Sequence, residues 1–200
     1  MLDELAASVT LISQQSQENL PILGIIALVP TVVFILNKLC QNRLLILGIF
    51  PRHLFGLVGI VFSPFLHGDF NHLFFNLIPL VVLSNFILME GIDVFIQVTI
   101  MIAVLSGFLV WCFGKKGIHI GASAVITGYW GYLVSNIFQQ GTFTAIILGA
   151  ISLYYFFGIF LGIFPAKKGV SWEGHLFGLV AGVCVNYLLS IGMAYPFSAI

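Results

Sequence analysis

Long apolar segments alternate with short polar or charged stretches along almost the whole chain. The apolar segments run over residues 20–39, 71–89, 93–113, 122–138, 142–164 and 174–194. A transmembrane helix needs about 20 predominantly apolar residues, because the hydrocarbon core of a bilayer is about 30 Å thick. Each segment meets or approaches that length. The pattern therefore predicts an all-α polytopic membrane protein, a bundle of six transmembrane helices.

Two stretches fall outside this pattern. Residues 1–19 are polar and lack the basic region that begins a signal peptide, so we expect a short polar N-terminal lead and a retained first helix. Residues 40–68 hold two apolar runs, 44–50 and 54–66, each too short to cross a bilayer. Irregular backbone at membrane depth has to be buried in protein. We therefore expect a membrane-embedded first loop within one six-span core over residues 20–200.

Composition strengthens the membrane assignment. Only 7% of the 200 residues are charged, 60% are hydrophobic, and the mean hydropathy is +1.13. A soluble domain carries about 25% charged residues, so this chain cannot cover itself with a water-compatible surface, and the lipid bilayer is its expected partner. The net charge of zero gives no indication of a nucleic-acid partner. Neither a disulfide or metal-binding cysteine spacing nor a His-Glu-x-x-His motif occurs, so we expect no metal and no cofactor.

Polar side chains stand out at the start of the second segment, because polar groups inside a membrane are costly and usually mark function. His72 and Asn76 are four residues apart and share one helix face. Both can donate hydrogen bonds, so the pair could hold an oxyanion. Helix capping or hydrogen bonding between helices is the alternative interpretation, and we favour it for His67 and Asn71 taken singly.

Two further polar residues lie at the heads of the fourth and sixth segments. Ser123, preceded by Gly121, and His175 have the chemistry of a nucleophile and its general base. Gly178 and Gly182 follow His175 on the same helix face, and such small residues allow helices to approach closely. Close approach is what a short hydrogen bond between serine and histidine requires.

The order of the spans also predicts that these polar residues lie close together. If all six segments cross the membrane, the loops after the first, third and fifth segments lie on one side. His67, His72, Ser123 and His175 all fall at helix ends that face that side. We therefore expect these four polar residues in one layer of the bundle.

Together these motifs resemble those of the rhomboid family of intramembrane serine proteases. The resemblance covers nearly the whole chain as a six-span core. It rests on His67, His72 and Asn76 on the second span, Gly121-Ala122-Ser123-Ala124 on the fourth, and His175, Gly178 and Gly182 on the sixth. The family implies a Ser–His dyad without an acidic third member. The sequence agrees, because residues 122–138 and 174–194 contain no Asp or Glu.

The resemblance also implies a role for each motif residue. Ser123 is the expected nucleophile and His175 the expected general base. His72, Asn76 and the Ser123 backbone N–H are the expected oxyanion hole. The residues with expected structural roles are His67, Gly121, Gly178 and Gly182.

Two positions depart from the family pattern. Ala124 follows the serine where many members have glycine, and its small side chain should be tolerated. Thr127 stands where many members have an aromatic residue that stacks on the base. We therefore expect the base to be oriented differently, by the Thr127 hydroxyl or by another ring.

The predicted function is that of an intramembrane serine endopeptidase that cleaves transmembrane segments of other membrane proteins. Its substrates would need helix-destabilising residues such as Gly or Pro, because a helix hides its peptide bonds. The alternative is a catalytically inactive rhomboid-like membrane protein that binds clients, and the intact Ser123 and His175 argue against it. A small transporter or channel would carry charges at the membrane midplane, whereas the charges here lie in the loops.

Two indications of membrane orientation disagree. All seven Lys and Arg residues fall in or beside the loops after the first, third and fifth segments, as Lys38, Arg43, Arg52, Lys115, Lys116, Lys167 and Lys168. The positive-inside rule would place that side, and the candidate site, in the cytoplasm. Resemblance to bacterial rhomboids implies the reverse orientation, in a bacterial inner membrane, and we adopt it here.

Overall fold

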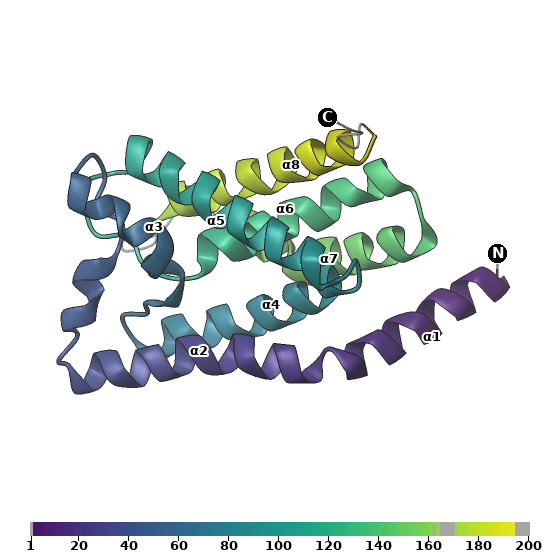
Figure 1. The fold of residues 1–200 in the computed structure, drawn as a ribbon, viewed down its shortest axis with the longest axis horizontal. Helices are drawn as coiled ribbons and strands as arrows, with labels where there is room; N and C mark the ends of the chain where they lie inside the picture. The colour runs from purple at the N-terminus through teal and green to yellow at the C-terminus, as the bar shows by residue number, and fades with distance from the viewer. Residues whose placement is uncertain (1, 162, 165–170, 195–200) are drawn as a thin grey trace, which may run out of the picture.

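Helices occupy every long apolar segment in the computed structural model, which describes residues 2–161, 163–164 and 171–194 (Figure 1). In chain order the elements are α1 (Leu2–Glu18), α2 (Leu20–Leu39), η1 (Arg43–Leu47), η2 (Leu54–Leu57), α3 (Gly59–Phe62), η3 (Ser63–Phe65), α4 (Phe70–Leu88), α5 (Ile92–Phe113), α6 (Ser123–Gln140), α7 (Phe143–Leu161) and α8 (Trp172–Ala194). The described residues contain no β-strand, only an isolated bridge between Ile49 and His119. The all-α fold class is therefore confirmed.

Six of these helices, α2 and α4 to α8, match the six predicted segments. Among the described residues, α2, α4, α5 and α8 are long and apolar enough to cross a membrane. The 18-residue α6 is less apolar, because it is enclosed by α4, α5, α7 and α8 and ten of its residues are buried. α7 ends at Leu161, earlier than predicted, and residues 163–164 lie outside it. That α6 and α7 also cross the membrane, to give six spans, thus remains a prediction.

The N-terminal lead is the helix α1, which precedes α2 along one edge of the bundle and reaches past the other helices (Figure 1). The Asn19 side chain donates a hydrogen bond to Asn85 Oδ1 (3.0 Å), and Asn85 Nδ2 donates to Ser16 Oγ (2.8 Å). These bonds join the junction of α1 and α2 to α4. The basic loop after α7, with Lys167 and Lys168, lies outside the described residues.

The predicted first loop consists of short helical turns that pack against α5. Ile60 of α3 lies against Gly107 of α5, where an added Cβ would come within 2.9 Å of Ile60 Cγ2. The Arg52 backbone N–H donates to Trp111 O (2.9 Å), and the Trp111 indole N–H donates to His53 O (2.8 Å). The expectation that this loop packs against the helices is confirmed. Its depth in a membrane remains a prediction.

At the end of the bundle away from the first loop, the Glu90 carboxylate links α4, α5 and α6. Glu90, in the turn between α4 and α5, accepts hydrogen bonds from Tyr132 (2.9 Å), Asn136 (2.7 Å) and Gln140 (3.0 Å), all on α6. Burial raises the pKa of the Glu90 carboxyl, and the hydrogen bonds from Tyr132, Gln140 and Asn136 offset part of that rise. This cluster ties the α4–α5 turn to the end of α6.

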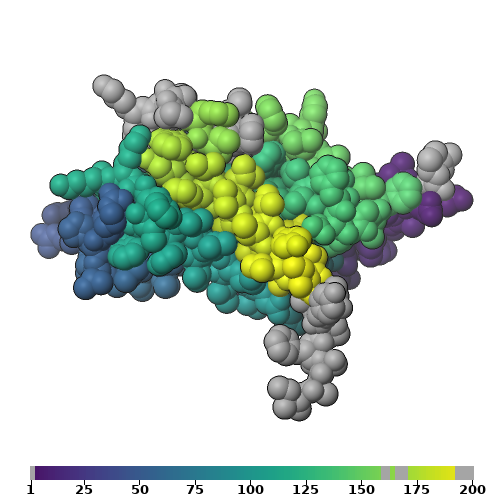
Figure 2. Space-filling view, turned by 90° about the horizontal axis from the view of Figure 1, so that it is seen from above, coloured from purple at the N-terminus to yellow at the C-terminus, as the bar shows by residue number. Residues whose placement is uncertain are grey.

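Helix α8 lies along one face of the bundle beside α5 (Figure 2) and packs most closely against α6. An added Cβ at Gly178 would collide with the carbonyl oxygen of Ala124, and one at Gly182 would collide with that of Gly128. The predicted close approach at these two glycines is therefore seen in the structure. Asn186 adds a polar tie by donating to Tyr132 O at 3.1 Å.

Gly178→Ala and Gly182→Ala are each expected to lower the free energy of unfolding by about 1–3 kcal/mol, the usual cost of overpacking. In both variants the added methyl group would collide with backbone atoms of α6, which cannot move aside as a side chain can. Gly24→Ala in α2 is the matched control, since a Cβ there meets nothing within 4 Å. Unfolding in mixed detergent micelles measures the difference. Equal stability of the three variants would show that α6 and α8 do not need this contact.

Candidate functional site

Ser123 is the first residue of α6, and a tight turn places it there. Gly121, two residues earlier, has a φ of +106°, a backbone conformation that favours glycine. Its N–H donates to Ser63 O in the first loop at 2.9 Å, which anchors the turn. A Cβ added at Gly121 would lie 2.5 Å from His72 Nε2 and 3.4 Å from Asn76 Nδ2. The two α4 side chains therefore reach the turn that carries Ser123.

A half-open pocket of about 600 Å³ lies over this turn. Its lining includes the predicted residues Ser123, His72, Asn76 and His175, together with residues of the turns before α4, α6 and α8. The structure thus brings the predicted nucleophile, base and side-chain oxyanion donors into one pocket, from three different helices. No predicted site residue falls among the undescribed parts of the chain.

The head of α4 sets the direction of His72. Asp69 caps this helix, because its carboxylate accepts a hydrogen bond from the His72 backbone N–H at 2.9 Å. The cap fixes where α4 begins, so His72 lies in its first turn and Asn76 one turn later, on the face toward Ser123. Asp69 itself lines the pocket.

Asn76 carries a donor with an unusual environment. The residue is only 8% exposed, and among the described residues none accepts a hydrogen bond from its Nδ2. A buried donor without a partner is costly, so such groups in native proteins call for a functional explanation. This donor lies beside the Ser123 turn, where an anionic oxygen could accept its hydrogen bond.

His67 lies behind this pocket and does not line it. It is 1% exposed, and its ring contacts the His72 ring edge to face, with centroids 5.0 Å apart. Burial, and next the neighbouring His72, lower the pKa of His67 to about 4. His67 thus contacts His72 without lining the pocket, and its structural role stays a prediction.

A second histidine, His119, connects the turn before α6 to the head of α8. Its Nε2 lies 2.8 Å from Lys115 O and its Nδ1 lies 2.7 Å from Ser171 Oγ. A carbonyl only accepts, so Nε2 carries the proton, and in the neutral ring Nδ1 accepts from the Ser171 hydroxyl. Ser171 Oγ in turn accepts from the Gly174 N–H at 3.3 Å, as an N-cap of α8.

This connection was not predicted from the sequence, although His119 and Ser171 lie four residues before Ser123 and His175. A serine one residue before a helix is a recognisable capping signal. The pairing of Ser171 with His119, across 52 positions, is visible only in the fold. The pair joins the two helix heads that carry the candidate nucleophile and base.

Two expectations from the sequence need correction. The sixth core helix does contain an acidic residue, because α8 begins at Trp172 rather than Gly174 and includes Glu173. The helix dipole favours an acidic residue at this position. The Glu173 carboxylate lies 3.6 Å from Lys115 Nζ, in the α5–α6 connection. The Thr127 hydroxyl does not donate to the base, because it donates to Ser123 O at 2.7 Å within α6.

Comparison with known proteins identifies the family of this helical chain. The family model of the rhomboid domain matches residues 54–192. An uncharacterized protein of Mycobacterium tuberculosis is 39% identical over 168 residues, which are 79% of this chain and 70% of that protein. An uncharacterized protein of Mycobacterium leprae is 39% identical over 142 residues, 66% of this chain and 56% of its own length. The chain belongs to the rhomboid family.

Ser171→Ala is expected to lower the free energy of unfolding by about 1–2 kcal/mol, because it removes both the α8 cap and the donor to His119. Ser171→Thr keeps the hydroxyl and should retain most of the stability. Ser190→Ala, which removes a hydroxyl bonded only within α8, serves as the control. If Ser171→Ala were as stable as Ser190→Ala, the connection would contribute nothing.

His67 is expected to make stability fall as the pH is lowered. Its pKa is about 4 in the folded protein, against an ordinary value of 6.5, so between these values the unfolded chain binds more protons. Stability should therefore decline from about pH 6.5 to about pH 4, by up to about 3 kcal/mol. Thermal unfolding in detergent should show a shallower decline in His67→Gln than in wild type. The exposed His53 provides the control variant His53→Gln, and identical pH profiles in both variants would contradict the prediction.

Proposed function

We propose that this protein is an intramembrane serine endopeptidase in which Ser123 is the nucleophile and His175 the general base. The observation that carries the proposal is the meeting of Ser123, His175 and the unpartnered Asn76 amide in one pocket at the heads of α4, α6 and α8. Membership of the rhomboid family, whose domain model matches residues 54–192, supports this reaction class. Each residue comes from a separate helix, so chance adjacency in sequence does not explain the cluster.

The chemistry follows the logic of a serine hydrolase. His175 takes the Ser123 hydroxyl proton as the oxygen attacks a peptide carbonyl, and later gives that proton to the leaving amine. A water molecule then releases the acyl group with His175 again as the base. The family resemblance implies a dyad without a carboxylate, and the Glu173 carboxylate lies 3.6 Å from Lys115 Nζ.

Three donors would stabilise the tetrahedral oxyanion. The Ser123 N–H is at the first position of α6, where helix N–H groups have no intrahelical acceptor and the helix dipole favours negative charge. Asn76 Nδ2 and His72 Nε2 lie beside the same turn. Donors held in place before the reaction are worth more than mobile ones, because no reorganisation is needed when charge develops.

The expected substrates are transmembrane segments of other proteins. A helical substrate has its peptide carbonyls occupied, so a segment has to unwind at the pocket, which favours Gly or Pro near the cut. The polar pocket, with Asp69 and Asn71 in its lining, provides partners for the water that hydrolysis consumes. We place the protein in a bacterial inner membrane with the pocket toward the outer face, the orientation common among bacterial rhomboids.

Ser123→Ala and His175→Ala should each abolish cleavage of a transmembrane substrate in nanodiscs, with a loss of roughly 10⁴-fold or more, because a nucleophile and its base act as a unit. For the same reason the double variant should be no worse than either single variant. A fluorophosphonate should label wild type at Ser123 and fail to label both variants. Ser190→Ala, on α8 away from the pocket, should behave as wild type.

A rhomboid-like protein that only binds clients would retain a transmembrane substrate without cutting it, and fluorophosphonate would not label Ser123. Normal turnover in purified Ser123→Ala protein would exclude Ser123 as the nucleophile.

A further inference from the structure

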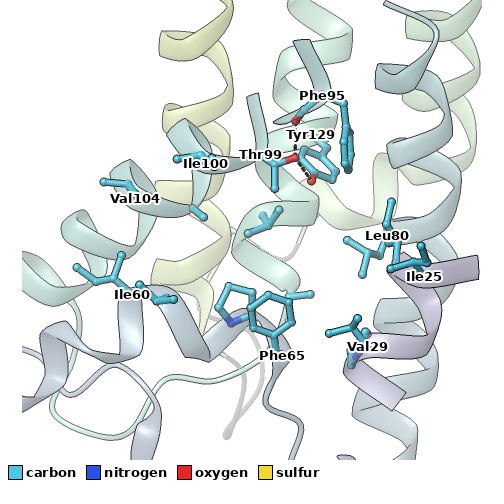
Figure 3. Close-up of a pocket in the computed structure, with 17 residues that line it drawn as sticks. Ile25, Val29, Ile60, Phe65, Leu80, Phe95, Thr99, Ile100, Val104 and Tyr129 are labelled. Carbon is cyan, nitrogen blue, oxygen red and sulfur yellow. Dashed lines mark hydrogen bonds between the residues drawn. The ribbon is translucent and has the colours of Figure 1, made fainter. Parts of the chain in front are cut away.

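A second cavity, of about 410 Å³, lies behind the turn that carries Ser123. Its walls come from α2, from α3 and η3 of the first loop, and from α4, α5 and α6. Figure 3 shows Ile25 and Val29 on one side, Ile60 and Phe65 below, and Thr99 and Tyr129 at the inner end. Nearly all of the lining is hydrocarbon.

The two hydroxyls in the wall are engaged with each other. Thr99 Oγ1 donates to Phe95 O at 2.6 Å, so the Tyr129 hydroxyl, 2.7 Å from Thr99 Oγ1, is the donor in that contact (Figure 3). Neither proton is therefore available to a molecule in the cavity. Water needs two to four polar partners to occupy a cavity, and an apolar cavity of about 150 Å³ stays dry and binds benzene instead. The larger cavity here suits a hydrocarbon longer than benzene.

The mouth of the cavity opens where lipid is expected. Four lining residues are more than half exposed, namely Ile25 (61%), Val61 (63%), Ile100 (57%) and Val104 (52%). Three of them belong to α2 and α5, both long and apolar enough to span a membrane. If α2 and α5 span the membrane, the bilayer interior surrounds the opening between them. The molecules able to enter are then the hydrocarbon chains of the lipids. A polar headgroup or an unpaired peptide backbone would find no hydrogen-bond partner inside.

We propose that this cavity binds one acyl chain of a bilayer phospholipid. The chain would lie directly behind the candidate site, because Ala122 and Val125 line the cavity while Ser123, between them, lines the polar pocket. Dispersion contacts with the walls stabilise the bound chain, since an empty cavity would forfeit them. This binding does not depend on the protease activity proposed above.

Photolabelling of wild type in nanodiscs tests the proposal directly. A phospholipid with a diazirine on its acyl chain is incorporated, irradiated, and its insertion sites are mapped by mass spectrometry. Val125 (5% exposed) and Tyr129 (1% exposed) lie on the central helix, at the inner wall of the cavity. Labelling of these residues is expected. Labelling confined to outward-facing side chains such as Val183, which is 45% exposed, would overturn the proposal.

A cavity-filling variant provides the second test. Ala103 lines the cavity on α5, so Ala103→Phe should abolish labelling of Val125 and Tyr129 while labelling of outward-facing residues persists. Val183→Phe places the same ring on the lipid-facing side of α8 and should leave labelling of the inner wall unchanged. Ala103→Leu provides a smaller change if the phenylalanine variant does not fold, and should reduce the label. Undiminished labelling of Val125 in a folded Ala103 variant would overturn the proposal.

Discussion

Direct contact between the backbones of α6 and α8 is the constraint on which the candidate site depends. Lipid tails are as apolar as leucine, so helices in a membrane associate through close packing rather than through exclusion of water. Gly178 and Gly182 let α8 rest on the carbonyls of Ala124 and Gly128. His175 is one turn from the first of these contacts, so the packing that holds the helices together also delivers the candidate base to the pocket of Ser123.

Hydrogen bonds between polar side chains then hold the two ends of the α6–α8 pair. At one end, Glu90 gathers three side chains of α6, and at the other, His119 holds Ser171 at the head of α8. A polar group that faces hydrocarbon without a partner costs several kcal/mol. Pairing these groups inside the bundle avoids that cost. Because α6 is enclosed by other helices, with ten of its residues buried, it can be less apolar than α2 and α5.

The first loop contributes by supporting the turn before α6 from behind. Ser63 O accepts the Gly121 N–H, and Ile49 pairs with His119 through backbone hydrogen bonds of 2.9 and 2.8 Å. The turn therefore separates two spaces of opposite character, a polar pocket of about 600 Å³ and an apolar cavity of about 410 Å³. The proposed hydrolysis would need both properties close together, a place that accommodates water and a surrounding surface compatible with lipid.

The sequence by itself determined the helix content, the order of the six core helices and the residues of the candidate site, because apolar length, glycine spacing and paired polar side chains are local properties of a chain. It also led to the rhomboid family, which comparison confirmed. Only the tertiary structure decided that His119 pairs with Ser171, that Glu173 turns toward Lys115, and that a cavity lies behind Ser123. These features join segments far apart in the chain, and their partners are selected by how the helices pack, which no local pattern records.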